Sequence, residues 1–274
     1  RMVELLSARD GDGYVFRVDL RLRPTPEATP IALPVEAAIS YYESMALGWE
    51  QAAFIRARAC AGDKALGEYF LQAIRPFIWR RSLDFGAIDA ILDISRRIRD
   101  HYANGQAFGP GYDLKRGRGG IREVEFFAQV HQLIHGGRQP ALRVGATREA
   151  VRLLGEWRVI EPEVVARLDA AYVLLRTIEH RLQMVDDRQT HEIPAHAEAL
   201  RNVARLHGLG EGQDLLDLLR PHVEWVGTNY DRLNPFQTEE RLSHDERRLP
   251  EQISAMGFTE AAPVMERVGR WRTG

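Results

Sequence analysis

The pattern of apolar and polar positions changes once along the chain, near residue 34. Before that point, we expect a strand at residues 14–23, in which residues 16–23 alternate between apolar and charged. The alternating positions are Val18, Leu20 and Leu22 on one side and Asp19, Arg21 and Arg23 on the other. Successive side chains of a strand point to opposite faces, so this pattern predicts a strand with one face in a core. Pro24 predicts its end, because proline has no N–H for a ladder.

After residue 34, apolar residues recur at steps of three or four, which is the period of amphipathic helices. We expect helices at 35–60, 64–74, 85–102, 121–134, 147–156, 162–186, 197–207, 211–233 and 262–271, after a first one at 2–8. Thr147 is expected to cap the helix at 147–156, and Pro221 to interrupt the one at 211–233. Four prolines between residues 24 and 34 indicate a stiff loop, with a short return strand at 31–33. The expected fold is mainly α, a helical bundle preceded by a β-hairpin.

Composition narrows the class of protein. The chain has 274 residues, 45% of them hydrophobic, and its formal net charge of −2 gives no global reason to expect nucleic acid or a membrane as partner. The single cysteine, Cys60, excludes a disulfide framework within the chain and fits a reducing cytoplasm. No apolar run approaches membrane-spanning length. Because the sequence starts at Arg1 inside an element, we expect a fragment of a longer protein.

The charged face of the predicted strand is the first candidate for chemistry. Asp19 can hold a divalent cation, and the guanidinium groups of Arg21 and Arg23 can grip phosphate oxygens through paired N–H donors. This combination suits metal-assisted phosphate chemistry. The alternative is a surface strand on which the charges form a self-cancelling ion pair.

A basic, glycine-rich segment ahead of the helix at 121–134 is the second candidate. Glycines before a helix leave backbone N–H groups available to an anion, and the helix dipole adds to the attraction. The segment contains Lys115, Arg116, Arg118 and Arg122 with Gly117, Gly119 and Gly120. Glu123 and Glu125 diverge by roughly 200° on a helix, so by themselves they cannot share a metal, and one of them is expected to hold an arginine. The alternative is a basic surface loop with a glycine-rich cap.

The end of the helix expected at 35–60 carries a third pattern. Trp49 and Glu50 are followed by Arg56 and Arg58. These residues either line a site or belong to ordinary helix packing with solvated arginines.

Two further patterns suggest metal ligands but favour simpler interpretations. His131 and His135 have the i, i+4 spacing of paired ligands, yet no third ligand is obvious, so packing is favoured. Asp10 and Asp12 form an Asp-x-Asp pair, yet glycines flank it, which favours a turn.

Five segments together resemble a known family. In order they are DGYVFRVDLRLRP, YYESMALGWEQAAFIRARACAGD, RPFIWRRSLDFGAI, GGIREVEFFAQVHQLIHGGRQPALR and DDRQTHEIP. From about residue 2 to residue 274 the chain resembles the bifunctional glutamine synthetase adenylyltransferase/adenylyl-removing enzymes. The third and fifth segments look like those of the N-terminal, adenylyl-removing half.

The resemblance implies a nucleotidyltransferase of nitrogen metabolism that reversibly adenylylates a tyrosine of glutamine synthetase. By this resemblance, the N-terminal half removes AMP by phosphorolysis, taking phosphate and releasing ADP, and the C-terminal half adds AMP from ATP. The implied cofactor is Mg²⁺ or Mn²⁺, with ATP or ADP as the nucleotide. The implied partners are glutamine synthetase and the PII regulatory protein, with no nucleic acid and no membrane, in the cytoplasm.

The resemblance also implies roles for single residues. Asp19 matches the third metal-binding carboxylate of the family's α/β nucleotidyltransferase palm, so the predicted hairpin would be a remnant of that palm. Arg21 and Arg23 match the arginines beside that carboxylate. Together with the residue patterns described above, this gives the expected phosphate- or nucleotide-binding residues, Arg21, Arg23, Arg56, Arg58, Lys115 and Arg122. The expected supporting residues are Trp49, Glu50, Gly119, Gly120, Glu123 and Glu125.

The chain departs from the family at the palm. The family has a Gly-Ser motif and an Asp-x-Asp pair well upstream of this strand, and no such Gly-Ser precedes Asp19. One carboxylate cannot organise two metal ions. We therefore expect residues 1–34 to be the distal edge of a truncated palm, 35–233 a helical domain and 234–274 the start of a linker, inactive alone. The alternatives are a non-catalytic helical module that docks glutamine synthetase or PII, and an enzyme related to PII uridylyltransferase, whose helical region is related to that of the adenylyltransferases.

Overall fold

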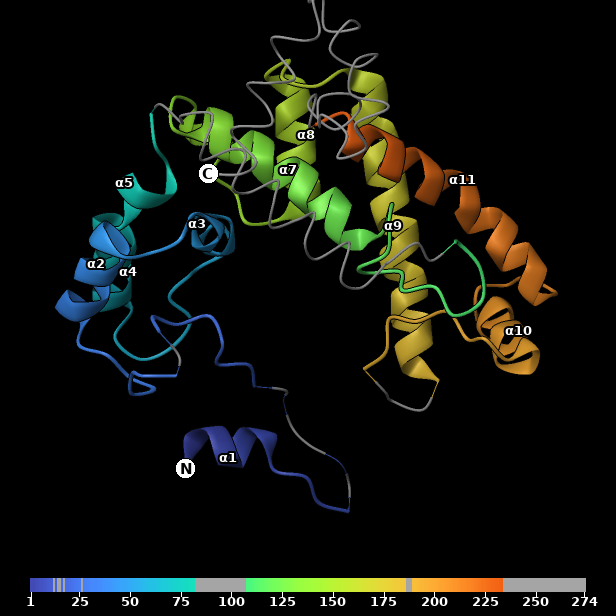
Figure 1. Ribbon diagram of the computed structural model, residues 1–274, viewed down its shortest axis with the longest axis horizontal. Helices are drawn as coiled ribbons and strands as arrows, with labels where there is room; N and C mark the ends of the chain where they lie inside the picture. Colours follow the sequence, from blue (N-terminus) through green and yellow to red (C-terminus); the bar gives the residue numbers. More distant parts are fainter. Residues whose placement is uncertain are drawn as a thin grey trace, which may run out of the picture. The chain divides into compact units, whose positions relative to one another are not determined.

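The structure is a computed structural model that describes residues 1–11, 13, 16, 18–25, 27–81, 107–185 and 189–233. These residues are mainly α-helical, as the periodicity predicted (Figure 1). The helices are α1 (Met2–Ser7), α2 (Val35–Ser44), α3 (Gly48–Phe54), α4 (Lys64–Ala73), α5 (Arg75–Ile78), α7 (Ile121–Gly136), the 3₁₀ helix η1 (Pro140–Leu142), α8 (Thr147–Glu156), α9 (Pro162–Met184), α10 (Ala197–Leu206) and α11 (Gly212–Asp231). The chain divides into two units, residues 1–226 and 227–274. The boundaries expected at 34/35 and 233/234 stay predictions.

The helices from α7 onward begin and end within two residues of their expected bounds. Pro162 occupies the first turn of α9, where its missing N–H costs nothing. The expectation that Pro221 interrupts the last of these helices is wrong, because α11 continues through it. Leu219 and Val223 on either side of the proline are buried, so packing on both sides holds the helix together. The helices expected at 85–102 and 262–271 lie outside the described residues.

The helix expected at 35–60 is wrong as a single element, because the chain breaks between α2 and α3. The reason is a buried carboxylate. Glu50 accepts the backbone N–H of Leu47 at 3.0 Å, which caps α3, and it also accepts the Tyr41 hydroxyl at 3.0 Å. The break lets Tyr42 and Phe54 meet edge to face, with ring centroids 4.6 Å apart.

The predicted strand and β-hairpin are not seen in the described part of the chain, which contains only isolated bridges. Tyr14, Val15 and Arg17 lie outside the described residues. The expected apolar face is also wrong, since Leu20 and Leu22 are exposed. A strand requires a neighbouring strand to hydrogen-bond with, and alternation by itself does not supply one.

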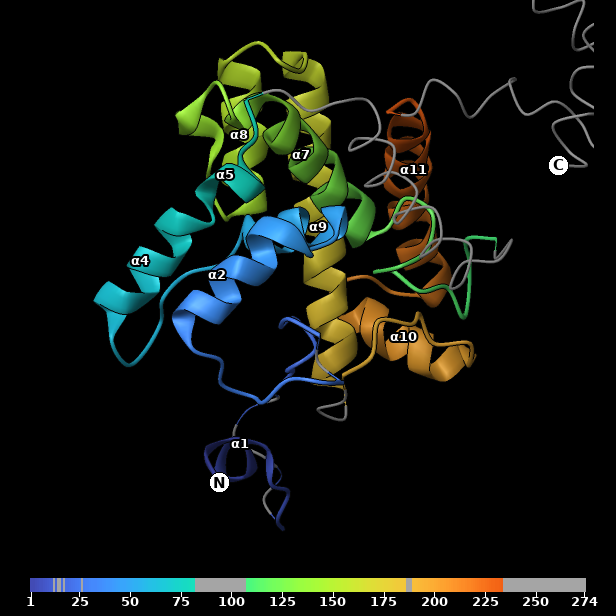
Figure 2. The same ribbon diagram turned by 60° about the vertical axis from the view of Figure 1, so that its left-hand side comes forward.

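The packed centre of the fold consists of α7, α8 and α9, which lie against one another (Figure 2). Along α9 the buried side chains recur at steps of three or four residues, at Leu168, Ala171, Leu175, Ile178 and Leu182. α3 also contacts α7, which brings the earlier helices to this centre. No helix of the described residues combines the length and apolar character needed to cross a membrane.

Candidate functional site

Asp19, Arg21 and Arg23 lie together, and their contacts run along their own segment. Arg21 Nη2 lies 2.5 Å from Asp19 Oδ2, and the Arg21 backbone N–H donates to Asp19 Oδ1 at 3.0 Å. Arg23 donates from Nη1 to the carbonyl oxygen of Thr29 at 2.7 Å and from Nε to that of Leu20 at 3.1 Å. These contacts shape the loop after residue 19. They include the ion pair that the alternative interpretation expected, and a role in binding metal or nucleotide stays a prediction.

The described residues do not by themselves form a metal site. Within the ranges that the structure describes, no three or more His, Cys, Asp or Glu side chains are grouped so that they could hold an ion. Asp19 is held by Arg21, and Asp10 pairs through its backbone with Gly13 in the expected turn. Asp12 is outside the described residues. A Mg²⁺ or Mn²⁺ ion therefore needs more ligands than Asp19 provides.

His131 and His135 confirm the packing interpretation of their spacing. Their rings stack with centroids 6.2 Å apart, and the His131 ring lies 4.9 Å from the ring of Phe127. Burial, and secondarily the charge on His135, lower the pKa of His131 to about 4 from an ordinary value of 6.5. His131 thus packs at the edge of the core in a neutral state at neutral pH, and His135 lies beside it, partly exposed.

This burial predicts a pH-dependent stability. Between pH 6.5 and pH 4 the unfolded chain binds a proton at His131 that the folded chain does not, so the free energy of unfolding falls as the pH falls. The full loss is roughly 3 kcal/mol for this residue. Urea unfolding from pH 7.5 to 4.5 measures it. His131→Leu should flatten the profile, whereas the exposed control His180→Leu should leave it unchanged. An equal slope in His131→Leu would contradict the assignment.

Arg56 is a predicted site residue whose side chain contacts both α7 and α8. Its Nη2 lies 3.2 Å from Oε1 of Glu125 on α7 and donates to the hydroxyl of Thr147 on α8 at 2.6 Å. Tyr172 on α9 donates its hydroxyl to the same Glu125 oxygen at 3.1 Å. Burial, and next the Glu125 charge, raise the pKa of Tyr172. The expectation that one of the two glutamates on α7 holds an arginine is confirmed.

The glycine-rich turn before α7 donates its backbone N–H groups to the protein's own oxygens. Gly119 donates to Glu123 Oε2 at 2.8 Å, Gly120 to the Gly117 carbonyl at 2.9 Å, and Ile121 to the Leu114 carbonyl at 2.9 Å. The N–H groups of Arg122 and Glu123 are also donated within the chain. An anion at this turn must therefore be held by side chains, because the backbone donors on which the sequence argument relied are already in use.

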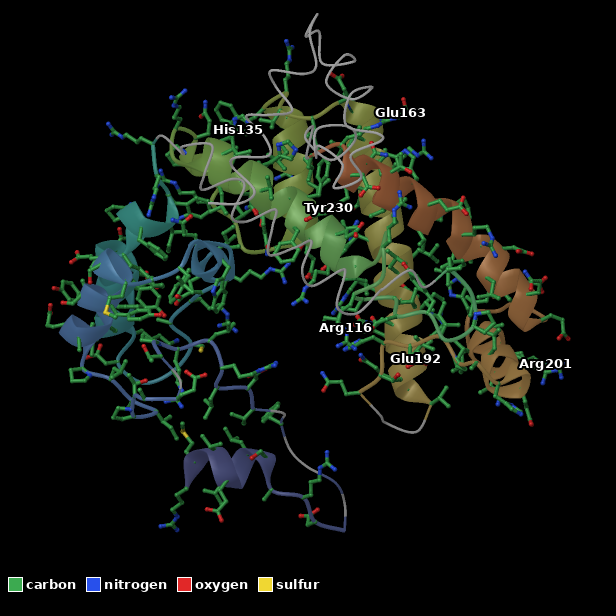
Figure 3. The ribbon with its side chains drawn as sticks, in the orientation of Figure 1. Arg116, His135, Glu163, Glu192, Arg201 and Tyr230 are labelled. Carbon is green, nitrogen blue, oxygen red and sulfur yellow. The ribbon has the colours of Figure 1, made fainter. Side chains whose placement is uncertain are left out.

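The segment at 191–193 forms backbone hydrogen bonds with residues 111–114, which lead into the same turn. Leu114 donates its N–H to the His191 carbonyl at 2.8 Å, and a bridge joins Asp113 to Glu192. Figure 3 labels Arg116 and Glu192, which come from these two segments. Arg116 Nε lies 2.7 Å from Asp113 Oδ2. The turn before α7 is thus brought together with the segment at 191–193, although the two lie about 80 residues apart in the sequence.

Glu179 is a buried charged residue that sequence reasoning missed. It lies on α9, 1% exposed, with Oε2 2.6 Å from Arg176 Nη1 and Oε1 2.7 Å from His191 Nδ1. Burial alone would raise the pKa of the Glu179 carboxyl, but the contact with His191 and the charges of Arg176 and Lys115 hold it below its ordinary value. The available signal was a carboxylate on the apolar side of an amphipathic helix, where an unpaired charge is too costly to bury.

The remaining predicted residues have simpler surroundings. Trp49 is half-buried and Arg58 is exposed. Glu50 is 5% exposed and serves as the cap of α3. Arg122 lies over the ring of Phe126 with 5.7 Å from Cζ to the centroid. None of these contacts identifies a ligand, so the binding roles expected for them stay predictions.

Comparison with family models defines the class of protein. Residues 93–233, just over half of the chain, match the model described as GlnD PII-uridylyltransferase, and the chain belongs to that family. Residues 1–73 match a second model, described as Glutamate-ammonia ligase adenylyltransferase. The relation to PII uridylyltransferase that was expected for the helical region is thus confirmed.

Comparison with curated proteins gives the nearer resemblance. The chain is 42% identical over its whole length to the bifunctional glutamine synthetase adenylyltransferase/adenylyl-removing enzymes of Rhizobium meliloti (strain 1021) and Agrobacterium fabrum, of which it spans 29%. It is 44% identical to the enzyme of that name from Caulobacter vibrioides, over 98% of the chain and 28% of that enzyme. The resemblance of the five segments to the bifunctional glutamine synthetase adenylyltransferase/adenylyl-removing enzymes is thus confirmed, while the assignment to one half of such an enzyme stays a prediction. The chain corresponds to less than a third of these enzymes.

Proposed function

We propose that this chain is the helical part of an enzyme that adenylylates and deadenylylates glutamine synthetase, and that it serves the adenylyl-removing half. The reaction would transfer AMP from a modified tyrosine to inorganic phosphate, which restores the tyrosine hydroxyl and releases ADP. The observation that carries the proposal is the identity of 42% over the whole chain to enzymes whose name includes both activities.

Within this proposal the charged side chains act on phosphate groups. Arg21, Arg23, Arg58, Lys115 and Arg122 are cations of the kind that bind phosphoryl oxygens. Arg56 would be a positioned cation, because Glu125 and Thr147 fix its guanidinium group. Asp19 would supply one ligand for Mg²⁺ or Mn²⁺, with the others from outside the described residues. PII would act on the same cytoplasmic enzyme as a regulatory partner.

The test is ADP release from AMP-modified glutamine synthetase in the presence of phosphate and Mg²⁺. The 274-residue chain is compared with the same chain extended upstream by its native sequence. We expect activity only in the longer protein, and a loss of at least a hundredfold when it carries Asp19→Asn. Asp10→Asn, in the turn, is the matched control and should stay active. Full activity of the 274-residue chain alone would refute the expected truncation of the palm.

The match at 93–233 favours uridylyl transfer to PII as the second candidate function. The longer protein, supplied with UTP and PII, should then label PII, whereas the primary proposal expects no labelled PII. If neither assay detects activity and the chain still binds glutamine synthetase or PII, the non-catalytic docking module is the better description.

A further inference from the structure

A pocket lined by arginines lies where two distant segments meet, residues 75–81 and residues 137–143. Its volume is about 710 Å³. Its charged and aromatic lining comes from Arg75, Trp79, Arg80, Arg81, Arg138 and Arg143, which we call the arginine pocket. Both segments belong to stretches that resemble the same family, yet none of the six residues was among those predicted to bind a ligand.

Two glycines at the end of α7 build the pocket by letting the segments touch. A Cβ atom on Gly137 would lie 1.9 Å from the carbonyl oxygen of Arg80, and one on Gly136 would lie 2.8 Å from the Trp79 ring. Arg138 donates from Nε to the Arg81 carbonyl at 3.2 Å, which closes the contact. The arginines of the two segments are therefore held close together by backbone packing.

Among the residues that the structure describes, no Asp or Glu lines the arginine pocket. Arg143 donates to the carbonyl oxygens of Gly136 and Gly137, at 2.7 Å and 3.2 Å, and its guanidinium group lies 5.8 Å from the Trp79 ring centroid. Burial, and next the nearby charge of Arg75, lower the pKa of Arg143. Like charges thus face one another across the pocket, which favours occupancy by an anion.

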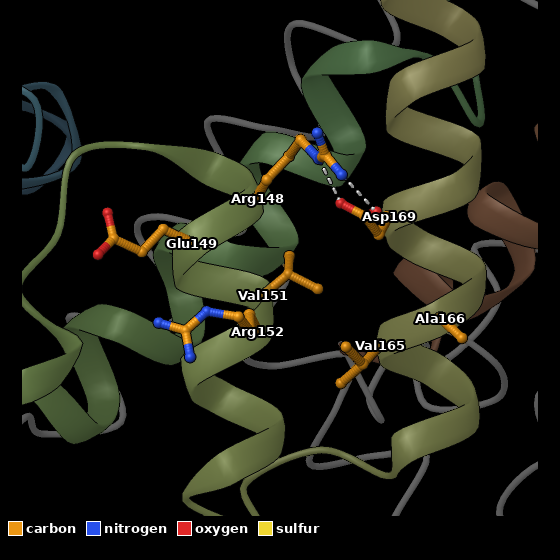
Figure 4. A pocket seen from close by; sticks show the side chains of 7 residues that line it. All are labelled: Arg148, Glu149, Val151, Arg152, Val165, Ala166 and Asp169. Atoms are coloured by element: carbon orange, nitrogen blue, oxygen red, sulfur yellow. Dashed lines mark hydrogen bonds and ion pairs between the residues drawn. The ribbon is translucent and has the colours of Figure 1, made fainter.

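The pocket between α8 and α9 is a useful contrast (Figure 4). It measures about 410 Å³, and its Arg148 is neutralised by Asp169 through two contacts of 2.6 Å and 2.9 Å. The dashed lines in Figure 4 mark this paired geometry. Arg148 therefore has its anion within the protein. The guanidinium groups of the arginine pocket have no such internal carboxylate in the described part of the chain.

We propose that the arginine pocket binds a small compound with several phosphate groups. Guanidinium groups match phosphate oxygens with two parallel N–H donors each, and five of them suit a ligand that carries three or more negative charges. The volume lies in the range of small-molecule sites, and a concave pocket of this size fits a compact ligand better than a protein surface. A nucleoside triphosphate and a free polyphosphate share this chemistry. The proposal does not depend on the proposed function.

Equilibrium dialysis or titration calorimetry of the 274-residue chain with tripolyphosphate and with ATP tests the pocket, at 50 and 200 mM salt. We expect saturable binding of one equivalent, weakened at the higher salt. Arg75→Gln with Arg80→Gln should weaken binding at least tenfold, since both side chains are exposed and form none of the pocket's backbone contacts. The control pair Arg201→Gln with Arg205→Gln on α10 changes the net charge equally and should alter the Kd less than twofold.

The outcomes separate the possible ligands. Equal affinity for ATP and tripolyphosphate identifies the phosphate chain as the whole ligand, and tighter binding of ATP adds a contact with the base. Equal weakening in the two double variants would show unspecific attraction and overturn the proposal. Tighter binding of a polyglutamate peptide would also overturn the proposal, because it would indicate an acidic protein partner. The absence of saturable binding of either probe at millimolar concentration would overturn it as well. Circular dichroism melting of both double variants verifies that they remain folded.

Discussion

Replacing Gly119 by alanine is expected to lower the free energy of unfolding by about 3 kcal/mol. Gly119 has φ of +82°, a left-handed conformation that costs an L-residue about 1 kcal/mol or more. The new Cβ would also lie 1.8 Å from the carbonyl oxygen of Val223 on α11, so the backbone of one segment has to move. Such overpacking typically costs about 1–3 kcal/mol.

The chain contains a matched control for this substitution. Gly208 has the same φ of +82°, but a Cβ there would have nothing within 4 Å. Gly208→Ala should therefore cost only the conformational part, about 1 kcal/mol. Urea unfolding of both variants measures the difference, which isolates the contact between the glycine-rich turn and α11. Equal losses in the two variants would show that this close approach is not maintained in solution.

The second large effect is expected for Glu179→Ala, which removes the buried carboxylate of α9. Arg176 and His191 would both lose their partner, and a small cavity would be left in the core. Breaking a buried pair by removing one member typically costs about 3–5 kcal/mol. Because Arg176 is 37% exposed and can be rehydrated, we expect the lower end, about 3 kcal/mol.

The position of Glu179 also predicts what a local probe should report. His191 is joined to the turn at 111–114, so the loss of Glu179 should raise the rate of amide hydrogen exchange at Leu114 and Ile193. Glu163→Ala on the same helix is the control, since the contact of Glu163 within the described part of the chain is an exposed pair with Arg167 at 3.9 Å. This substitution should cost less than about 1 kcal/mol. A similar cost for both variants would mean that the buried ion pair contributes nothing beyond a surface pair.

Much of the helical structure could be predicted from local pattern, and the failures have physical causes. α8 begins and ends where it was expected, because its apolar stripe and its flanking residues are local signals. The break between α2 and α3 was missed because it depends on Glu50 reaching back to Leu47 and Tyr41 in a buried setting. The predicted hairpin is not seen in the described residues, and local alternation is a weak guide to it because a strand forms only beside a neighbouring strand.

For the candidate site residues, too, the sequence identified individual side chains but not their tertiary contacts. Arg56 and Glu125 were both singled out, but only the packing of the segment after α3 against α7 and α8 shows that they form one cluster with Thr147. Thr147 was expected to cap α8, yet the residue at the cap is Ala146 and the hydroxyl accepts from Arg56 instead. A side chain's partner depends on which surfaces meet, and periodicity carries no information about that.

The amino-acid order alone therefore settles the mainly helical class, most helix bounds after residue 120, and the resemblance to glutamine synthetase adenylyltransferase/adenylyl-removing enzymes. The helical class and the helix bounds depend on interactions between residues near one another in the sequence. The family resemblance depends only on the identity and order of the residues. The arginine pocket and the Glu179 ion pairs required the tertiary structure. The arginine pocket joins residues 75–81 with 137–143, and the packing of backbones at Gly136 and Gly137 places the two segments together. Arg176 lies one helical turn from Glu179, but His191 reaches Glu179 only because the chain after α9 folds back onto that helix.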